Sequence, residues 1–356
     1  MPRGREGTTL ISDSALEPVL AVRNLCVEYT TRAGSVHAVS DVSFDIFPHE
    51  TLGLVGESGC GKTATCLAIL GLLRAPGGKV TGGEVIFRGA DLTRLTAKAF
   101  RRLRGRDVSM ILQESVSALN PVATIGRQID EAIKVHNRKL PRAERRAAVL
   151  ELLHQVGIPQ PSLRYNRYPH ELSGGMRQRV MIAISIANRP SLLIADEPTT
   201  ALDVTIQAQI VDVLKHVQRQ SHASTLLVTH DLGLVSQTAD RVIVMYAGSI
   251  VETGDVMTIF GSPRHPYTVG LHQSVPRLSG ATERLTPIPG QPPSLLGEHT
   301  GCPFQPRCFL SRNRRRCLDE APALREIGTV GHTVACHFAE ELNPSTDNHR
   351  TASRDG

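Results

Sequence analysis

The first part of the chain alternates apolar and polar residues, whereas two later stretches are apolar throughout. Residues 19–30 and 37–47 repeat with a period of two, which predicts half-buried strands of an antiparallel sheet. The stretches "SLLIADEP" (191–198) and "STLLVTHD" (224–231) are typical of short strands buried on both faces of a parallel sheet. Residues 205–220, between them, have the pattern of an amphipathic helix. We therefore expect an α/β core with an antiparallel β subdomain.

The pattern also divides the chain into segments. Residues 18–262 are predicted to form the main domain, in which residues 98–188 are mainly helical and residues 241–255 form a hairpin that turns at Ala247 and Gly248. Proline becomes frequent from about residue 262, and "TPIPGQPPSLLGE" (286–298) has the composition of an extended linker. Residues 263–340 are predicted to form a small annex. The polar segments 1–17 and 341–356 are predicted to be a disordered lead and tail.

Composition and charge narrow the possible environments. No apolar run approaches the roughly 20 residues that cross a bilayer, and the first residues lack an apolar signal core, so we expect a cytoplasmic protein that meets membranes only through partners. The net charge of +6 fits anionic ligands and an ordinary solvated surface equally well. The basic run "RNRRRC" (312–317) has no interleaved aromatic residues, which favours a solvated face or contact with acidic lipid over nucleic acid.

The stretch "GESGCGKT" (56–63) matches the phosphate-binding pattern G-x-x-x-x-G-K-[ST] in full and lies between an apolar strand and a helix. Its glycines allow backbone N–H groups to surround phosphates, and the helix adds the positive end of its dipole. Lys62 is expected to reach the β- and γ-phosphates, and the Thr63 hydroxyl to bind Mg²⁺. The predicted nucleotide-binding residues here are Gly56, Glu57, Ser58, Gly59, Cys60, Gly61, Lys62 and Thr63.

Two carboxylates follow the apolar strand of "SLLIADEP". Asp196 and Glu197 stand at the carboxyl end of this strand, where ligands of open α/β sheets bind. Asp196 is suited to support Mg²⁺, and Glu197 to polarise the attacking water as a general base. His230 ends the next apolar strand, from which it could contact a γ-phosphate or orient the water. Together these residues predict a phosphate-hydrolysing site.

Two further residues admit two interpretations each. Gln113 follows the apolar run "SMIL" and could bind Mg²⁺ or the catalytic water, or be an ordinary polar loop residue. Tyr29 could be a stacking platform for adenine or a core aromatic residue.

The stretch "LSGGMRQR" (172–179) precedes "LLIADEPTTALD", and "GESGCGKT" and "THD" flank the pair in order. Over about residues 19–260 the chain resembles the ATP-binding subunit of an ABC transporter, with the α/β fold of P-loop NTPases, an antiparallel β subdomain, a helical subdomain and a small cysteine-containing annex. The resemblance implies that two subunits pair head to tail and that each supplies Ser173, Gly174 and Gly175 to the γ-phosphate bound by the other. It also implies that residues 201–203, which include Asp203, run along this dimer seam.

The glycines of that stretch precede a predicted helix, so they can present N–H groups and a helix dipole to an anion. A second anion-binding helix start would be redundant at the first ATP, which favours a second nucleotide. The resemblance assigns the loop of Gln113 and the following helices to contact with membrane subunits. It also shows one departure: His49 stands where the family usually has glycine.

The stretches "YPHELSGGMRQRVMIA" and "HPYTVGL", together with the annex, resemble importers of dipeptides, oligopeptides and nickel. This resemblance implies an ATPase at the cytoplasmic face of the membrane that couples ATP-driven dimer closure and hydrolysis to transport. Its implied partners are two membrane-spanning permease subunits, a second identical or sister ATPase and, indirectly, an extracytoplasmic binding protein; the cargo stays open. The alternative is a soluble ABC ATPase that acts on nucleic acid or ribosomes, although such proteins usually have two fused modules or a coiled-coil insertion.

The annex contains four cysteines with the spacing C-x5-C-x8-C-x18-C: Cys302, Cys308, Cys317 and Cys336. Their clustering suggests a metal site more than disulfides in a reducing compartment. Thiolates suit zinc or an iron–sulfur cluster, and the thiols could also be unliganded. The resemblance adds that some ATPases of this group carry a [4Fe–4S] cluster in the annex. His332 and His337 are alternative ligands or ordinary loop residues.

Overall fold

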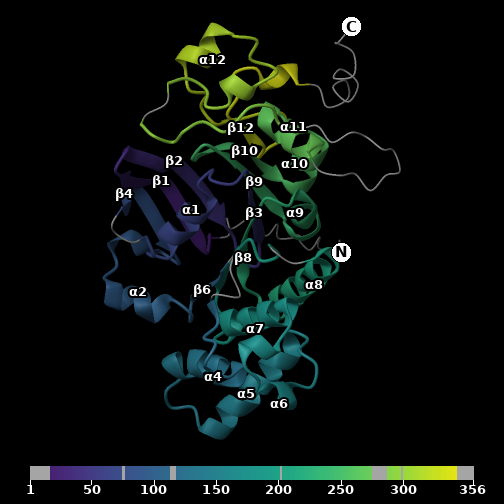
Figure 1. Cartoon of the computed structure of the whole chain (residues 1–356). Coiled ribbons are helices and arrows are strands. Elements are labelled where there is room, and N and C mark those ends of the chain that lie inside the picture. The colour runs from purple at the N-terminus through teal and green to yellow at the C-terminus, as the bar shows by residue number, and fades with distance from the viewer. Residues whose placement is uncertain are drawn as a thin grey trace, which may run out of the picture.

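The computed structural model describes residues 17–73, 77–112, 118–200, 203–274, 287–297 and 300–342. At its centre is a sheet with the strand order β11-β12-β10-β9-β3-β8-β7-β6, and the strands from β9 to β6 run parallel (Figure 1). Strands β10, β12 and β11 extend its other edge in antiparallel pairings. The strands are β3 (Thr51–Val55), β6 (Val108–Ile111), β7 (Leu192–Asp196), β8 (Ser224–Thr229), β9 (Arg241–Tyr246), β10 (Ser249–Asp255), β11 (Arg325–Glu326) and β12 (Thr333–Val334).

The parallel strands are buried on both faces, as their continuous apolar sequence predicts. In β7, Leu192 and Ile194 belong to one core cluster, whereas Leu193 and Ala195 belong to the other. Successive side chains of a strand point to opposite faces, so an apolar residue at every position supplies both cores. The prediction of a buried parallel sheet is confirmed.

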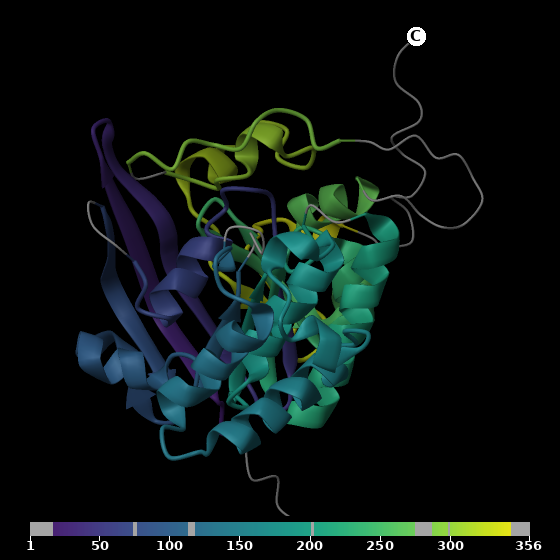
Figure 2. The same cartoon turned by 60° about the horizontal axis from the view of Figure 1, so that its bottom comes forward.

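An antiparallel sheet with the order β2-β1-β4-β5 covers one face of the central sheet. In Figure 2 its strands form the wall at the left, opposite the teal helices. Its first two strands coincide with the alternating stretches at 19–30 and 37–47, which confirms the predicted antiparallel start. The strands are β1 (Leu20–Thr31), β2 (Gly34–Ile46), β4 (Gly78–Phe87) and β5 (Ala90–Asp91).

Helices cover the second face and fill the space beside the first. Helix α1 packs in the core that includes the antiparallel sheet, whereas α4, α5, α7 and α8 pack in the other core. The longer helices are α1 (Lys62–Ile69), α4 (Ile125–His136), α5 (Arg142–Gln155), α7 (Gly174–Ile186), α8 (Val204–Ser221) and α11 (Pro266–Gln273). The shorter ones are α2 (Ala97–Leu103), α6 (Pro161–Arg164), α9 (Leu232–Thr238), α10 (Val256–Gly261), α12 (Arg315–Asp319) and the 3₁₀ turns η1 (Leu92–Arg94), η2 (Pro169–Glu171), η3 (Gln305–Arg307) and η4 (Ala339–Glu341).

The segment predicted to be mainly helical also contributes to the sheet. Helices α4, α5 and α6 lie together at the bottom of Figure 1, far from the annex. Strand β6, however, lies inside this segment and is the edge strand of the central sheet, where it pairs with β7. The predicted limits of the helical subdomain stay a prediction.

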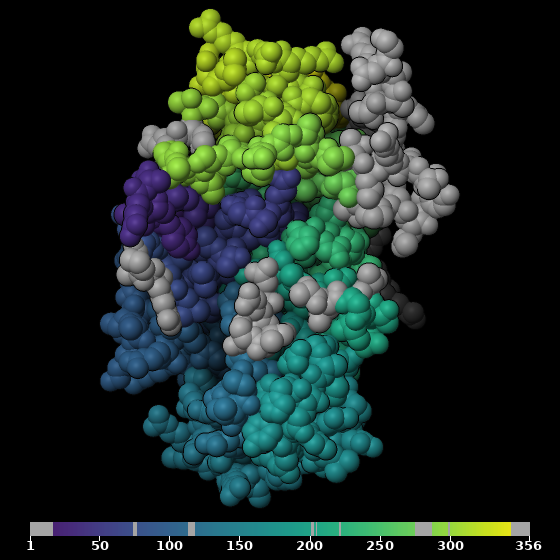
Figure 3. All heavy atoms as spheres, viewed as in Figure 1, coloured from purple at the N-terminus to yellow at the C-terminus, as the bar shows by residue number. Residues whose placement is uncertain are grey.

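The annex lies at the top of the molecule, against the core (Figure 3). Its strand β12 pairs with β10, and the main-chain N–H of His37 in β2 donates to the Leu295 carbonyl over 2.9 Å. The proline-rich stretch before it therefore runs along the core instead of away from it. Its predicted limits at 263–340 stay a prediction, and the predicted lead and tail fall almost entirely outside the described residues.

Two turns explain local sequence choices. The hairpin of β9 and β10 turns at Ala247 and Gly248, which have φ values of 48° and 85°, so the predicted turn is confirmed. His49 has a φ of 66°, which is a left-handed conformation that glycine adopts most easily. Its Nδ1 lies 2.8 Å from the His222 carbonyl oxygen, a contact that a glycine at this position could not make.

Among the described residues, none of the helices combines the length and the apolar character that crossing a bilayer requires.

Candidate functional site

The predicted phosphate loop lies between β3 and α1, at the carboxyl end of the central strands. A Cβ atom at Gly61 would overlap the carbonyl oxygen of Ala38, and one at Gly56 would overlap that of Met245. Gly61 also has a φ of 107°, so glycine is needed there for both space and conformation. Ser58 and Gly59 form the exposed tip of the loop.

Lys62 is buried at the centre of this loop. Its Nζ donates to the carbonyl oxygens of Gly56, over 2.6 Å, and Glu57, over 3.0 Å. Cys60 Sγ lies 3.9 Å from the same Nζ, and burial raises the pKa of the Cys60 thiol, which keeps it neutral. The loop thus concentrates one positive charge among main-chain groups, an arrangement that suits an anionic phosphate.

Asp196, at the end of β7, is only 2% exposed. Burial raises its pKa, the neighbouring Glu197 acts in the same direction, and a hydrogen bond from the Thr63 hydroxyl opposes both. Its Oδ1 is buried without a hydrogen-bond partner among the described residues. Carboxylate and hydroxyl oxygens are the ligands that Mg²⁺ prefers, so Asp196 and Thr63 fit a magnesium site.

Glu197 lies beside two groups that hold its carboxylate. The Thr200 hydroxyl donates to Oε2 over 2.6 Å, and His230 Nδ1 lies 3.1 Å from Oε1. Burial tends to raise the pKa of Glu197, but these hydrogen bonds and the His230 charge together hold it below its ordinary value. Glu197 also has a φ of 46°, a left-handed conformation that costs energy for a side-chain-bearing residue and recurs at functional sites.

The second glycine-rich stretch begins α7. Ser173 Oγ accepts a hydrogen bond from the Met176 N–H over 3.3 Å, and Gly174 is the first helical residue. A Cβ at Gly175 would lie 2.6 Å from Ile206 Cγ2, so glycine lets α7 approach α8 closely. Helices α1 and α7 pack in the cores on opposite faces of the central sheet.

The remaining predicted residues have varied positions. Asp203 caps α8, since its Oδ1 accepts a hydrogen bond from the Ile206 N–H over 3.0 Å. Tyr29 is half-buried on β1, and its ring packs against the backbone of Gly78. Gln113 lies outside the described residues.

The structure also contains contacts at this site that sequence motifs do not suggest. Thr200 follows Glu197 by three residues, and this spacing was the available signal for its hydrogen bond. Arg307 and Tyr267, from the annex, both contact Glu57 of the phosphate loop. Nothing local in "FQPRC" or "HPYTV" indicates these contacts.

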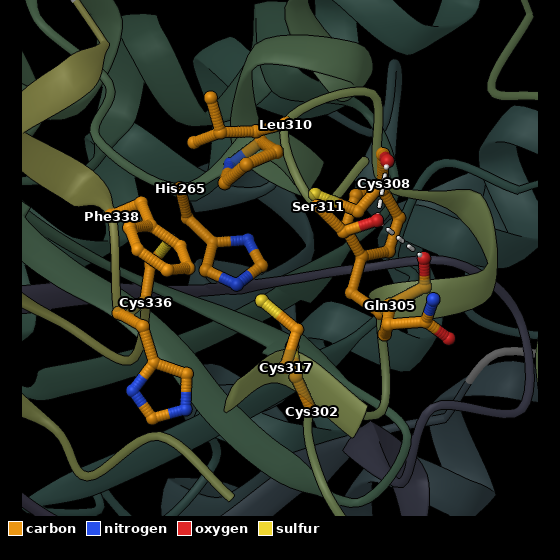
Figure 4. Close-up of a pocket in the computed structure, with 12 residues that line it drawn as sticks. His265, Cys302, Gln305, Cys308, Leu310, Ser311, Cys317, Cys336 and Phe338 are labelled. Atoms are coloured by element: carbon orange, nitrogen blue, oxygen red, sulfur yellow. Dashed lines mark hydrogen bonds between the residues drawn. The ribbon is translucent and has the colours of Figure 1, made fainter. Parts of the chain in front are cut away.

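The four annex cysteines line one pocket, together with His265, Phe304 and Phe338 (Figure 4). Burial raises the pKa of the Cys302 thiol to about 11 and that of Cys336 to about 12, and the pKa values of Cys308 and Cys317 are raised for the same reason. No disulfide joins them. In the part of the chain that the structure describes, no group of His, Cys, Asp or Glu side chains is arranged closely enough to hold a metal ion.

The two annex histidines differ in environment. His332 is buried, and its Nε2 lies 2.8 Å from Glu252 Oε1. His337 lines the pocket, while its Nε2 lies 2.9 Å from the Glu320 carbonyl oxygen. Both therefore have hydrogen-bond partners of their own.

Three arginines of the basic run at 312–317 pair with carboxylates. Arg314 contacts Glu341, and the next two arginines contact acids four residues ahead. These ion pairs are typical of a solvated face.

Comparison with known proteins extends these observations. Residues 39–200 match the family model described as ABC transporter, and residues 251–317 match the one described as oligopeptide/dipeptide transporter, C-terminal region. The chain is 49% identical over 326 residues to the dipeptide transport ATP-binding protein DppD of Bacillus subtilis, an alignment that covers 92% of this chain and 96% of that protein. It is also 49% identical over 322 residues to the oligopeptide transport ATP-binding protein OppD of Mycobacterium tuberculosis, which covers 90% of this chain and 52% of that protein.

Two solved structures have the same fold. One is the ATP-binding cassette MJ0796 in a dimeric post-hydrolysis state bound to ADP and Pi, with a TM-score of 0.59, 27% identity, and coverage of 67% of this chain and 98% of that chain. The other is cbiO1 from Clostridium perfringens, part of the ABC transporter complex cbiONQ, with a TM-score of 0.59, 26% identity, and coverage of 69% and 92%. With this fold, these phosphate-site residues and near-complete coverage of a relative, the chain belongs to the ABC transporter family as an ATP-binding, ATP-hydrolysing subunit.

Proposed function

We propose that this chain is the ATPase of an importer for dipeptides or oligopeptides. The observation that carries the proposal is the annex, because residues 251–317 match a C-terminal region described for oligopeptide and dipeptide transporters. The names of the relatives from Bacillus and Mycobacterium support the same cargo class. In this proposal the chain binds two membrane-spanning permease subunits at the cytoplasmic face of the membrane, and an extracytoplasmic binding protein delivers the cargo.

The phosphate loop would bind ATP through its main-chain N–H groups and Lys62. The Lys62 ammonium would leave the carbonyls of Gly56 and Glu57 and pair with the β- and γ-phosphates. Thr63 and Asp196 would hold Mg²⁺, to which the unpartnered Oδ1 of Asp196 offers a ligand. When bound, Mg²⁺ neutralises charge that develops on the phosphate oxygens.

Glu197 would act as the general base of hydrolysis. Its ionised carboxylate, held by Thr200 and His230, accepts a proton as a water oxygen attacks the γ-phosphorus and the bond to the β-phosphate oxygen breaks. His230 is 62% exposed and could turn its other ring nitrogen towards the γ-phosphate. Gln113 would complete this set at Mg²⁺ or the water, and Tyr29 would stack on adenine.

A second ATPase subunit, identical or a sister, would supply the rest of the site. Ser173, Gly174 and Gly175 would contact the γ-phosphate bound by the partner subunit, since they begin a 13-residue helix. The first N–H groups of a helix have no acceptor within the helix and can bind an anion. Asp203 would lie at the seam between the subunits. ATP then stabilises the dimer, hydrolysis releases it, and the motion reaches the permeases as a rigid-body rotation.

One substitution tests the catalytic assignment. Glu197→Gln should retain ATP binding, lose hydrolysis and accumulate as an ATP-bound dimer in size-exclusion chromatography. Glu151→Gln, at an exposed position of α5, is the matched control and should behave as wild type. A Glu197→Gln protein that stays monomeric with ATP and hydrolyses normally would show that the roles are wrong.

The cargo is tested separately, in cells that lack this subunit. Uptake of a labelled dipeptide, a labelled hexapeptide and nickel should be compared after return of the wild-type chain or of Glu197→Gln. Peptide uptake restored only by the wild type supports the proposal, whereas restored nickel uptake without peptide uptake contradicts it. The alternative of a soluble ATPase for nucleic acid or ribosomes is not favoured, because the relatives from Bacillus and Mycobacterium are transport proteins and three arginines of the basic run pair with carboxylates.

We further propose that the four annex thiols hold a [4Fe–4S] cluster. Four thiols that share one pocket match the donor set of such a cluster, although no group of the described side chains lies closely enough to hold a metal ion without rearrangement. The cluster would supply a structural link between the loops of Cys302, Cys308, Cys317 and Cys336. Protein purified without oxygen should contain about four iron atoms per chain, and Cys317→Ser should remove them whereas Cys26→Ser should not. About one zinc per chain would indicate zinc instead, and neither metal would indicate unliganded thiols.

A further inference from the structure

An arginine of the annex forms an ion pair with the phosphate loop. Arg307 lies in η3, between Cys302 and Cys308, and donates from Nη1 to Glu57 Oε2 over 2.6 Å and from Nη2 to Oε1 over 3.0 Å. Both oxygens of the carboxylate are engaged, so the geometry is the two-pronged one in which guanidinium and carboxylate match best. The Arg307 side chain is 4% exposed, which limits screening by water and salt.

Arg307 is held in place from its own side of the contact. Its Nε donates to the Pro289 carbonyl over 2.9 Å, and Nη2 lies 3.3 Å from that of Ile288. Its guanidinium carbon lies 5.8 Å from the centre of the Tyr246 ring and 6.0 Å from that of Phe304. The annex therefore determines where this charge lies.

A second annex residue holds the main chain of Glu57. The Glu57 N–H donates to the Tyr267 hydroxyl over 2.7 Å. Tyr267 is fully buried, and the centre of its ring lies 4.6 Å from the ring centre of Tyr246 and 5.5 Å from that of Phe304. Its hydroxyl therefore has little freedom to move. One residue of the loop is thus held by the annex through both side chain and backbone.

Glu57 is connected in turn to the lysine of the loop. Its carbonyl oxygen accepts from Lys62 Nζ over 3.0 Å. A displacement of Glu57 therefore moves an acceptor of Lys62 and changes the curvature of the segment that surrounds the phosphates.

We propose that Arg307 is a positioning residue for ATP binding: through Glu57, the annex holds the phosphate loop in the shape that binds ATP. The inference rests on the proposed assignment of this loop to ATP. Without the ion pair, only a fraction of the molecules has the binding-competent loop, and the apparent dissociation constant rises by the inverse of that fraction. Saturating ATP restores the competent loop, so the effect falls on KM and leaves kcat nearly unchanged.

The experiment compares four variants with wild type: Glu57→Gln, Arg307→Gln, the combination of both, and the charge-conserving Arg307→Lys. Arg325→Gln is the control, because Arg325 forms the same two-pronged pair with Glu340 elsewhere in the annex, over 2.6 and 2.9 Å. KM for ATP, kcat, the dissociation constant of a fluorescent ATP analogue and the melting temperature are measured for each. Glu57→Gln and Arg307→Gln should each raise KM about tenfold with kcat within about twofold, as expected if the competent fraction falls to about a tenth.

Three results support the proposal together. The KM of the combined variant is no higher than that of either single variant, and the KM of Arg307→Lys lies between those of wild type and Arg307→Gln. Arg325→Gln leaves KM unchanged. If Arg307→Gln fails to fold, Glu57→Gln still decides the matter, because it replaces one carboxylate oxygen by an NH2 group and changes no residue of the annex. Unchanged KM in Glu57→Gln, or an equal rise in Arg325→Gln, overturns the proposal.

Lys62→Ala separates this failure from failure of the underlying assignment. If Lys62→Ala loses nucleotide binding while Glu57→Gln does not change it, the loop binds ATP and only the positioning role is wrong. If Lys62→Ala binds nucleotide as wild type does, the assignment of the loop to ATP is itself wrong, and the positioning role is overturned with it.

Discussion

His230 Nδ1 lies 3.1 Å from Glu197 Oε1, so the residues that directly follow two neighbouring central strands, β7 and β8, meet over the carboxyl edge of the sheet. The contact orients the imidazole, since a hydrogen bond at one ring nitrogen decides how the other is directed. Parallel strands end at the same edge, which is why two residues 33 positions apart come together. Glu197 and His230 therefore restrict each other's side-chain orientation.

Substitution of His230 by alanine should lower kcat about 10- to 100-fold, a range below the full contribution of a general base. KM for ATP should change less than about twofold, because the loop and Lys62 are untouched. Steady-state ATPase kinetics check this, with His216→Ala on the exposed side of α8 as the control. Equal losses in kcat and in nucleotide affinity would contradict an orienting role.

Thr200→Val should make the acid limb of the pH–rate profile move to higher pH. The Thr200 hydroxyl donates to Glu197 Oε2, and this hydrogen bond lowers the pKa of the carboxyl against the effect of burial. A general base works only when ionised, so loss of the bond raises the pKa and removes active enzyme at the acid end first. The profile of kcat measures the effect when it extends below the pKa of about 4.3 of an unperturbed glutamate. A limb that does not move, or moves to lower pH, would refute the assignment.

Gly175→Ala should separate packing from nucleotide contact. The new Cβ would lie 2.6 Å from Ile206 Cγ2, and such overpacking costs about 1–3 kcal/mol of unfolding free energy. Adding Ile206→Ala makes room, so the double variant should lose less stability than the sum of the single losses. Denaturant unfolding measures this non-additivity. ATPase activity should stay low in the double variant if Gly175 also contacts the partner's ATP, whereas recovery of activity would reduce its role to packing.

How much of this protein could be predicted from sequence depends on how local the determining contacts are. That residues 56–63, 196–197 and 230 lie at one edge of the sheet was predictable, because each stands at the end of an apolar strand and parallel strands bring their ends together. Their roles at ATP stay a prediction. The first two strands of the antiparallel sheet were predictable from the alternation of apolar and polar residues alone. Thr200 was within reach, because it lies in the same short loop as Glu197.

The contacts between the annex and the core could not be predicted from the sequence, for a physical reason. Arg307 is 250 positions from Glu57, and no periodicity or motif encodes that pairing. Strand β12, Thr333–Val334, is too short to produce an alternating pattern, so its addition to the core sheet has no sequence signal. The proline-rich stretch was interpreted as a linker from composition, although its backbone hydrogen bonds to β2.

A buried histidine should make the stability of the annex depend on pH. Burial, opposed by the charge of Glu252 and a backbone hydrogen bond, lowers the pKa of His265 to about 4 from an ordinary value of 6.5. Between these values the unfolded chain binds a proton that the folded protein does not, so stability is full above pH 6.5 and declines as pH falls towards 4. The loss should reach about 3 kcal/mol, at 1.36 kcal/mol per pH unit. His265→Asn keeps a side-chain acceptor for the Tyr267 N–H at the start of α11 but cannot titrate. Urea unfolding at a series of pH values should therefore show a shallower decline in His265→Asn than in wild type; equal slopes would mean that another group carries the pH dependence.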